Sequence, residues 1–293
     1  MIELERDVAL ARLTTIGTGG PARYLGRPET AEQLAEVLAW AGENGVPVET
    51  IGLGSNLLAA DEGVDALVLR LAGDLAGVRV EGETLVAGGG ATNAVCLHRA
   101  REAGLGGLEF ASAIPGTAGG GVRMNAGAYG RDWRSVVVDA LVLGPGGARR
   151  LTVDELDLSY RHSGLGAGEV VAEVRFRLAP RAPVAIRAEV AELLAQRKAT
   201  QPTNKRTFGS VFKNPPDGPG AGRMIEEVGL KGHRFGGALI SPRHANFIEN
   251  AGDATSADAV ALMAEARRRV HEQFGVVLEH EVRFLGGLAL PPL

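Results

Sequence analysis

The sequence contains very little cysteine and few aromatic residues. Cys96 is the single cysteine, which excludes an internal disulfide and a cysteine metal cluster. Aromatic residues make up 4% of the 293 residues. No run reaches the roughly 18 consecutive apolar residues that a membrane-spanning helix needs. The charged first residues also lack the apolar segment of a secretory signal, so we expect a cytoplasmic protein with no membrane partner.

An excess of one charge is missing as well. The formal net charge is −4, which gives no overall attraction to nucleic acid, and we expect no nucleic-acid partner. Lysine is scarce: Lys198, Lys205, Lys213 and Lys231 are the only lysines among 31 basic residues. A GC-rich genome and adaptation to heat both explain this bias, and we favour the genome.

The common nucleotide and metal motifs are absent. No GxGxxG and no Walker pattern occurs, which disfavours a Rossmann fold and a phosphate-binding loop of the P-loop type. None of the six histidines has HExxH or another ligand spacing, so we predict no metal site.

Glycine, in contrast, is abundant, with 42 residues. The stretch 110–130, FASAIPGTAGGGVRMNAGAYG, has no helical or strand period and few charges. Glycine serves where the backbone takes positive φ or comes close to something that is not protein. Two interpretations stay open for this stretch. One is a loop around a large, partly polar ligand, and the other is a buried crossover between strands.

The periodicity of the remaining chain predicts an α+β fold. Thr30 and Gln33 form a capping-box pattern before a helix that ends near Gly45. A strand at 46–51, a second glycine turn at 52–56 and a strand at 66–71 complete a β-α-β unit. We predict further strands at 78–80, 84–87, 136–143, 149–153, 170–178, 245–249 and 276–285. Further helices are predicted at 91–103, 184–199, 223–228 and 255–274.

Three polar residues are candidates for chemistry. Arg161 lies between two predicted strands, Ser210 follows a glycine, and Glu281 lies in the last predicted strand. An arginine, a glutamate and a serine around a carboxylate-bearing substrate could stabilise an enolate and deliver a proton. Each residue taken singly also has a structural explanation, as a surface ion pair, a turn residue or a solvated strand position.

Seven segments together resemble the UDP-N-acetylenolpyruvoylglucosamine reductase family, the flavoenzymes of peptidoglycan precursor synthesis. The segments run from near the start of the chain almost to its end, and in this order they are specific. They are IGTGGPARY at 16–24, IGLGSNLL at 51–58, AIPGTAGGGVRMNAGAY at 113–129, YRHS at 160–163, GSVFKNP at 209–215, residues 223–229, and LEHEVRFLG at 278–286.

The resemblance implies a FAD-binding domain of the vanillyl-alcohol-oxidase type, made of two α+β subdomains, and a smaller α+β substrate-binding lobe. The subdomains would span 1–75 and 76–180 and the substrate lobe 185–274, with 275–293 as a C-terminal strand and tail that return to the FAD site. It further implies reduction of UDP-N-acetylglucosamine enolpyruvate to UDP-N-acetylmuramate, with NADPH as reductant. The small-molecule partner would be this UDP-sugar, and we expect a monomer.

The resemblance also assigns residues position by position. Ser210 would be the proton donor, and Arg161 and Glu281 would stabilise the enolate. The expected FAD contacts are Gly52, Gly54, Ser55, Asn56, Ser112, Pro115, Gly116, Gly119, Asn125, Gly127, Tyr129 and Arg283. The expected substrate contacts are Tyr160, Lys198, Lys213 and Asn214.

One feature of the family is missing here. One branch carries an additional tyrosine-bearing loop between the arginine and serine motifs, and the span 161–210 contains no tyrosine. The chain therefore resembles the branch without that loop. Neither glycine loop holds a histidine or cysteine, so we expect noncovalent FAD. Another flavoprotein oxidase or dehydrogenase of the same fold, and a non-enzymatic nucleotide-sugar binding module, are the competing interpretations.

Overall fold

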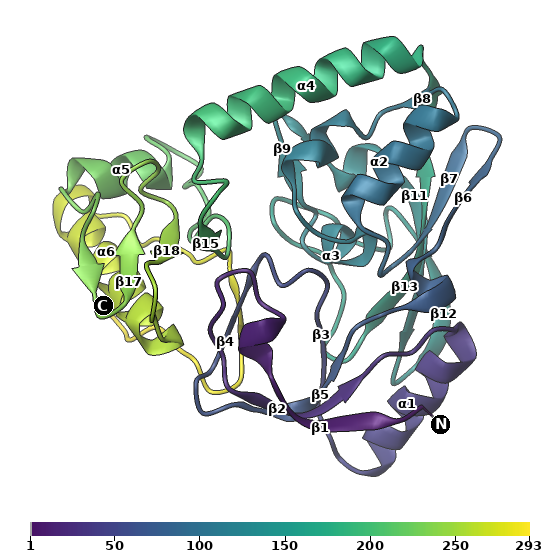
Figure 1. The fold of residues 1–293 in the computed structure, drawn as a ribbon, viewed down its shortest axis with the longest axis horizontal. Helices are drawn as coiled ribbons and strands as arrows, with labels where there is room; N and C mark the ends of the chain where they lie inside the picture. Colours follow the sequence, from purple (N-terminus) through teal and green to yellow (C-terminus); the bar gives the residue numbers. More distant parts are fainter. Residues whose placement is uncertain (1) are drawn as a thin grey trace. The chain divides into compact units, whose positions relative to one another are not determined.

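The structure is a computed structural model that describes residues 2–293. The chain forms two compact units, and each is assembled from separated segments (Figure 1). The first unit holds Met1–Arg6, Tyr24–Leu53 and Ala66–Arg197, of which Met1 is not described. The second holds Asp7–Arg23, Gly54–Asp65 and Lys198–Leu293. The four-part division of the chain made from the resemblance stays a prediction.

A five-stranded antiparallel sheet is the centre of the first unit. Its strand order is β12-β11-β13-β7-β6. Helices α2 and α3 lie beside it, with α2 against β6 and β7 and α3 against β13 and β7 (Figure 1). The bounds are Val78–Glu81 for β6, Thr84–Gly88 for β7, Val137–Gly144 for β11, Gly147–Thr152 for β12, Val170–Arg177 for β13, Asn93–Glu102 for α2 and Ala118–Arg123 for α3. The predicted hairpin at 78–87 and the three long strands after it are confirmed.

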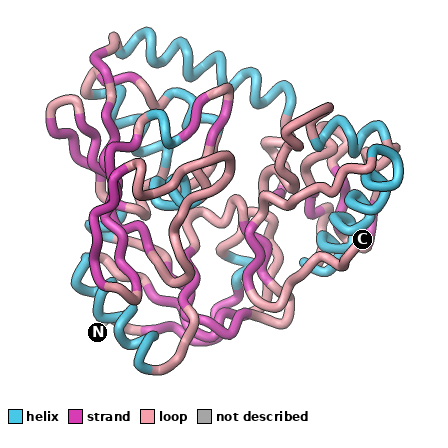
Figure 2. The backbone as a smooth tube through the Cα atoms, turned by 180° about the vertical axis from the view of Figure 1, so that it is seen from behind, coloured by secondary structure: helices cyan, strands magenta, loops and turns pink. Residues whose placement is uncertain are grey.

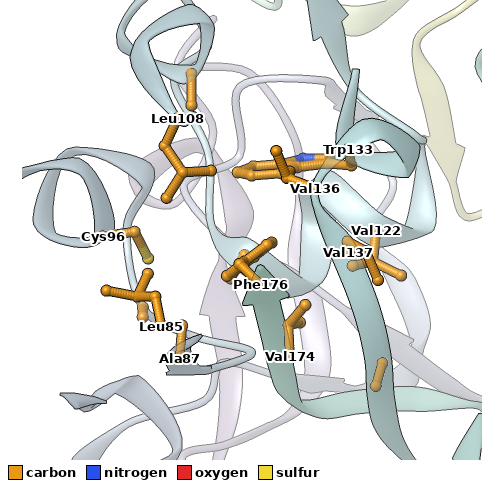
Figure 3. Close-up of a cluster of buried hydrophobic side chains, with 14 of the residues drawn as sticks. Leu85, Ala87, Cys96, Leu108, Val122, Trp133, Val136, Val137, Val174 and Phe176 are labelled. Carbon is orange, nitrogen blue, oxygen red and sulfur yellow. The ribbon is translucent and has the colours of Figure 1, made fainter. Parts of the chain in front are cut away.

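The apolar core of this unit is built around Trp133 (Figure 3). The Trp133 ring lies 5.1 Å from the Phe176 ring and 5.6 Å from that of Phe110, measured between centroids. Cys96 is fully buried in the same cluster, as expected for a small core residue. The spacing in the helix predicted at 91–103 places Val95, Cys96 and Ala100 on one apolar face. Cys96 and Ala100 are buried, but Val95 is 44% exposed, so the prediction for Val95 is wrong.

A second core of the first unit lies under helix α1, Ala31–Glu43. Thr30 caps the helix by accepting the amide of Gln33, which confirms the predicted start. Strands β3 (Val48–Thr50) and β5 (Val64–Leu69) are parallel neighbours, which confirms both predicted strands with shifted ends. Helix α1 precedes both strands and does not connect them, so their pairing is not the predicted β-α-β unit. They belong to a sheet of order β1-β2-β5-β3, with β1 at Leu4–Ala9 and β2 at Pro21–Gly26.

The second unit combines a four-stranded sheet with helices α5 and α6. The strand order is β15-β18-β17-β16. Helix α6 begins after Thr255 in a complete capping box with Asp258 and ends at Gly275, which has φ +68°. The bounds are Arg206–Thr207 for β15, Arg234–Phe235 for β16, Ala238–Ile240 for β17, Ile248–Asn250 for β18, Ala221–Glu227 for α5 and Ser256–Phe274 for α6. Both helices and the strand near 248 are confirmed with shifted ends.

The last predicted strand is largely wrong. Only Arg283–Leu285 (β19) pairs, in parallel with Leu57–Ala59 (β4). His280 makes one isolated bridge to Phe212, so Glu281 lies between two short paired stretches and not inside a continuous strand. Short elements complete the fold. They are β8 (Leu105–Gly106), β9 (Gly127–Ala128), β10 (Arg131–Asp132), β14 (Ala179–Pro180) and the 3-10 turns Leu10–Arg12, Gly73–Ala76, Glu109–Ala113 and Trp133–Ser135.

Helix α4 (Pro183–Thr200) confirms the prediction for 184–199 and is the long cyan coil at the top of Figure 2. Ile186 is its one buried residue, so the helix is stabilised by little apolar packing. Within residues 2–293, no helix has the length and apolar character needed to cross a membrane.

Candidate functional site

The glycine stretch at 110–130 contains a helix that its sequence did not predict. Thr117 caps α3 by accepting the amide of Gly120. Three successive glycines are poor helix formers, and packing explains why they are helical here. A Cβ atom at Gly119 would lie 2.9 Å from the Gly89 carbonyl oxygen, and one at Gly121 would collide with the Trp133 indole. Glycine at these two positions therefore lets the helix approach its own core.

Gly116 and Gly120 are different, because almost no neighbouring protein atom would obstruct a side chain at either position. A Cβ at Gly120 would meet only its own cap, Thr117 Oγ1, at 3.4 Å, and one at Gly116 would meet only Asn93 Nδ2 at 3.5 Å. Gly120 is exposed while both of its neighbours in α3 are buried. The loop thus has a packed side and an open side, and glycine on the open side suits close approach of a ligand.

The two glycine-rich segments meet within the first unit. A Cβ at Gly52 would lie 2.7 Å from Thr117 Oγ1, so the absence of a side chain lets the backbone at Gly52 contact the start of α3. Ser112, at the end of the preceding 3-10 turn, has a buried hydroxyl with no hydrogen-bond partner among the described residues. The same holds for Asn93 Oδ1, while Asn93 Nδ2 donates to the Ile114 carbonyl. Buried polar atoms of this kind need a partner, and a ligand can supply it.

Three of the predicted site residues have left-handed backbone conformations. The φ angles are +38° for Asn125, +54° for Tyr129 and +54° for Arg161. Such angles are unusual outside glycine and persist where surrounding contacts enforce them, which is common at functional sites. Tyr129 is anchored by its hydroxyl, which donates to the Leu193 carbonyl of α4 at 3.0 Å.

Arg161 lies at the tip of a tight turn. Ser159 and His162 exchange main-chain hydrogen bonds of 3.2 and 3.1 Å, which leaves Tyr160 and Arg161 as the two central residues. The Arg161 guanidinium donates to the Gly127 carbonyl at 3.0 Å and lies 5.3 Å from the centroid of the exposed Tyr160 ring. The structure therefore joins Arg161 to the predicted cofactor residue Gly127.

In the second unit, two distant segments hold Ser210 and Glu281 on neighbouring backbones. The Glu281 amide donates to the Val211 carbonyl at 2.8 Å, and the Lys213 amide donates to the Glu279 carbonyl at 2.9 Å. Gly209, at φ +82°, precedes Ser210 and packs close to the Ser55 carbonyl. The serine and the glutamate, 71 positions apart in the sequence, thus belong to one local structure.

The 54–56 part of the second glycine turn joins this same structure. Asn56 Nδ2 donates to the Glu281 carbonyl at 3.1 Å, and the Arg283 amide donates to the Asn56 carbonyl at 3.0 Å. Gly54 has φ +66°, and a Cβ there would collide with the Leu13 carbonyl. Gly54, Ser55, Asn56 and Arg283 are therefore placed together with Glu281.

The remaining predicted residues are also located. Lys213 forms an ion pair of 3.4 Å with Glu279, and Asn214 Oδ1 accepts the Ala221 amide at the start of α5. Lys198 lies in the last turn of α4 and is exposed, and Pro115 is exposed just before Gly116. Sequence reasoning overlooked Arg123, the only charged residue of the stretch 110–130, whose guanidinium donates to the carbonyls of Leu165 and Gly166. A single charge in an otherwise uncharged stretch was the signal that could have identified it.

Burial alters several protonation equilibria. It raises the pKa of the Cys96 thiol to about 12, so this thiol stays protonated and unreactive at neutral pH. Burial also lowers the pKa of His244, whose Nδ1 accepts the Asn246 amide at 3.2 Å. Asn246 in turn bonds both main-chain groups of Phe212, next to the segment that carries Ser210.

Comparison with known protein families identifies the class of protein to which the chain belongs. The family description "FAD binding domain" matches residues 22–151, and "UDP-N-acetylenolpyruvoylglucosamine reductase, C-terminal domain" matches residues 201–285. The fold is therefore that of a FAD-containing oxidoreductase of mixed α and β structure.

Full-length relatives narrow the class. A reductase of this name from Symbiobacterium thermophilum is 47% identical over 97% of this chain and 92% of its own length. Another from Rubrobacter xylanophilus is 45% identical over 96% of this chain and 94% of its own. The crystal structure of the enzyme from Thermus caldophilus matches with a TM-score of 0.85 at 38% identity, covering 97% of this chain and all of that one. The chain belongs to the UDP-N-acetylenolpyruvoylglucosamine reductase family.

The residues of the first unit fit the flavin cofactor of that family. Gly116 and Gly120 leave one side of the loop clear of side chains, and the buried Ser112 hydroxyl offers a hydrogen bond. The loop carries no lysine, histidine or cysteine that would form a covalent link to the cofactor.

Proposed function

We propose that this protein reduces UDP-N-acetylglucosamine enolpyruvate to UDP-N-acetylmuramate, with NADPH as the reductant. The relatives' name and the matched family descriptions support this substrate. The single structural observation that favours it is the backbone pairing that holds Ser210 beside Glu281. FAD, when bound, would supply the hydride chemistry of this reduction.

In this proposal the chain's own residues stabilise the negative charge of the enolate and supply the proton that is added to carbon. Arg161 faces the developing negative charge of the carboxylate and enolate, because a guanidinium binds such oxygens in a bidentate manner. The Ser210 hydroxyl gives its proton to carbon, and Glu281 assists that transfer. A serine hydroxyl is a weak acid, but it suffices against a strongly basic enolate from which water is excluded.

The other predicted residues would bind and orient FAD and the UDP-sugar. The two glycine segments would hold FAD noncovalently, together with Arg283 of β19. Their contributing residues would be Gly52, Gly54, Ser55, Asn56, Ser112, Pro115, Gly116, Gly119, Asn125, Gly127 and Tyr129. Tyr160, Lys198, Lys213 and Asn214 would bind the UDP-sugar. A monomer suffices, since every proposed group comes from one chain, and the proposed location is the cytoplasm.

The test is an anaerobic half-reaction. The purified protein should be yellow, and after reduction with NADPH the flavin absorbance should return on addition of UDP-N-acetylglucosamine enolpyruvate. Another oxidase or dehydrogenase of the same fold would instead be reoxidised rapidly by the ketone product of an alcohol. If only the ketone restores the absorbance, the proposed substrate is wrong.

A further inference from the structure

The turn that carries Arg161 is fastened to the glycine stretch by a series of side-chain hydrogen bonds. Arg134 Nη1 donates to the Leu158 carbonyl and Asn125 Nδ2 to the Ser159 carbonyl, both at 2.9 Å. Ser163 Oγ donates to the Arg123 carbonyl at 2.8 Å. Two consecutive main-chain carbonyls before Arg161 and one side chain after it are therefore bonded to residues between 123 and 134.

This fastening explains how the turn keeps its conformation. A left-handed φ is unfavourable in a residue such as arginine, so the surroundings must enforce it. Arg161 has φ +54°, and its guanidinium is tied back to the Gly127 carbonyl. The position of this side chain is thus set by the residues that precede and follow Gly127.

The Asn125 side chain joins the 159–162 turn to the segment that holds Asp132 and Arg134. It is 1% exposed, and Nδ2 donates to the Ser159 carbonyl and to Asp132 Oδ2, at 2.9 and 3.1 Å. Its Oδ1 accepts the amide of Arg134 at 2.9 Å. Both amide hydrogens are directed at protein acceptors, so the side chain has no N–H left to donate to a cofactor.

We propose that Asn125 is a positioning residue for Arg161: it fixes the 159–162 turn so that the guanidinium meets the reacting carboxylate. The inference rests on the proposed function for the role of Arg161. It replaces direct cofactor contact by the Asn125 side chain with an effect transmitted through Ser159.

Asn125→Asp is the sharpest variant. Aspartate has the same shape and tolerates positive φ, but its carboxylate cannot donate to Ser159 and is repelled by Asp132. Asn250→Asp is the matched control in the second unit. Asn250 Nδ2 likewise donates to a main-chain carbonyl, that of Ile16 at 3.0 Å, and its Oδ1 accepts the amides of Gly252 and Ala254.

The experiment is a double-mutant cycle on the rate at which UDP-N-acetylglucosamine enolpyruvate reoxidises the reduced holoenzyme at saturating FAD. We expect N125D alone to slow this step about 10- to 100-fold, the usual effect of losing a residue that orients a catalytic group. In an Arg161→Ala background, N125D should cause no further loss, because the residue it positions is gone. Reduction by NADPH should be unchanged, and N250D should leave both steps unchanged.

A measurement on the cofactor-free protein separates positioning from cofactor binding. The amides of Ser159 and His162 each donate to the other residue's carbonyl across the turn. They should exchange with solvent at least about tenfold faster in N125D and not in N250D. Unchanged exchange, or an equal rate loss with and without Arg161, would overturn the proposal. So would a defect confined to the FAD Kd.

A replacement variant and a separate readout cover the cases in which N125D does not fold or the wild-type enzyme is inactive. If N125D does not fold, Asn125→Gly retains the positive φ, removes the same bonds and enters the same cycle. If the wild-type enzyme is not reoxidised by this substrate at all, the proposed function fails. The exchange data on the turn then still decide whether Asn125 holds it.

Discussion

The two units build their parts of the predicted site by different means. In the first unit, side chains bond to main-chain carbonyls around residues with positive φ, as Asn125 does with Ser159. In the second unit, main chain bonds to main chain, as the Glu281 amide does with the Val211 carbonyl. The first arrangement depends on particular side chains, whereas the second depends on the backbone path and on the few residues that fix it.

The difference predicts opposite sensitivities to mutation. Substitutions near Arg161 should change function through side-chain bonds, while Ser210 and Glu281 should be displaced only when the backbone around them is released. A second contrast lies within α3, where Gly121 packs against the core and the adjacent Gly120 faces open space.

The largest expected effect comes from Gly121→Ala. Its Cβ would overlap the rigid Trp133 indole, which is fully buried in the core and cannot move aside. We expect a loss of about 3 kcal/mol or more in the free energy of unfolding, the upper range for overpacking. Denaturant unfolding measured on the cofactor-free protein would show it.

The adjacent Gly120→Ala is the control for that substitution. Space around Gly120 is open, and alanine is the better helix former, so unfolding stability should rise by up to about 1 kcal/mol. FAD affinity should fall, since the methyl group would face the proposed ligand side. Equal destabilisation by both substitutions would refute the division of α3 into a packed and an open side.

Asn246→Ala should have the next largest effect and act through the backbone. It removes the partners of both main-chain groups of Phe212, at 2.9 and 2.8 Å, in a residue that is 4% exposed. Leaving buried groups unsatisfied costs about 1–3 kcal/mol each, so we expect a loss of at least about 2 kcal/mol in the free energy of unfolding and slower substrate-driven reoxidation. Wild-type stability and turnover in Asn246→Ala would contradict the claim that the backbone path in the second unit positions Ser210 and Glu281.

The smallest expected effect is a difference in pH dependence. Burial lowers the pKa of His244 below its ordinary 6.5, so between these values the unfolded chain binds a proton that the folded protein does not. Stability should therefore fall as the pH drops below 6.5, and His244→Asn should flatten this slope. Thermal unfolding of the cofactor-free protein, wild type and variant, from pH 7.5 to 5 measures this slope.

Glu173 in the first unit should respond in a more acidic range. Burial raises its pKa, but hydrogen bonds from Arg150 and Arg79 outweigh burial and hold the pKa below 4.5. Its stabilising effect is present above 4.5 and is lost as the pH falls through the folded value. The difference between wild type and Glu173→Gln should shrink below 4.5 only. A shared pH range for both variants would contradict this assignment.

The sequence was sufficient for the periodic elements, because caps and apolar spacing are local signals. Thr30 and Thr255 marked helix starts that the structure confirms. Helix α3 was missed, since its glycines oppose helix formation and only contacts with Gly89 and Trp133 stabilise it. Such contacts join residues far apart in the chain, which no local pattern reports.

The sequence and the resemblance nominate residues for the candidate site, but they do not show how those residues are hydrogen-bonded. The resemblance placed Asn125 among the cofactor residues, but no sequence pattern could show that its amide is directed at Ser159 and Asp132. The prediction that Glu281 lies in a continuous strand is wrong, because pairing there depends on a single bridge to Phe212.

The central claim is that Ser210 supplies the proton that completes reduction of the substrate. Ser210→Ala should leave reduction of the flavin by NADPH nearly unchanged and slow anaerobic reoxidation by UDP-N-acetylglucosamine enolpyruvate by about 10²–10⁴-fold, the usual contribution of a general acid. Stopped-flow absorbance of the two half-reactions, with wild type and variant side by side, gives both rates. Reoxidation at the wild-type rate in Ser210→Ala would contradict the account.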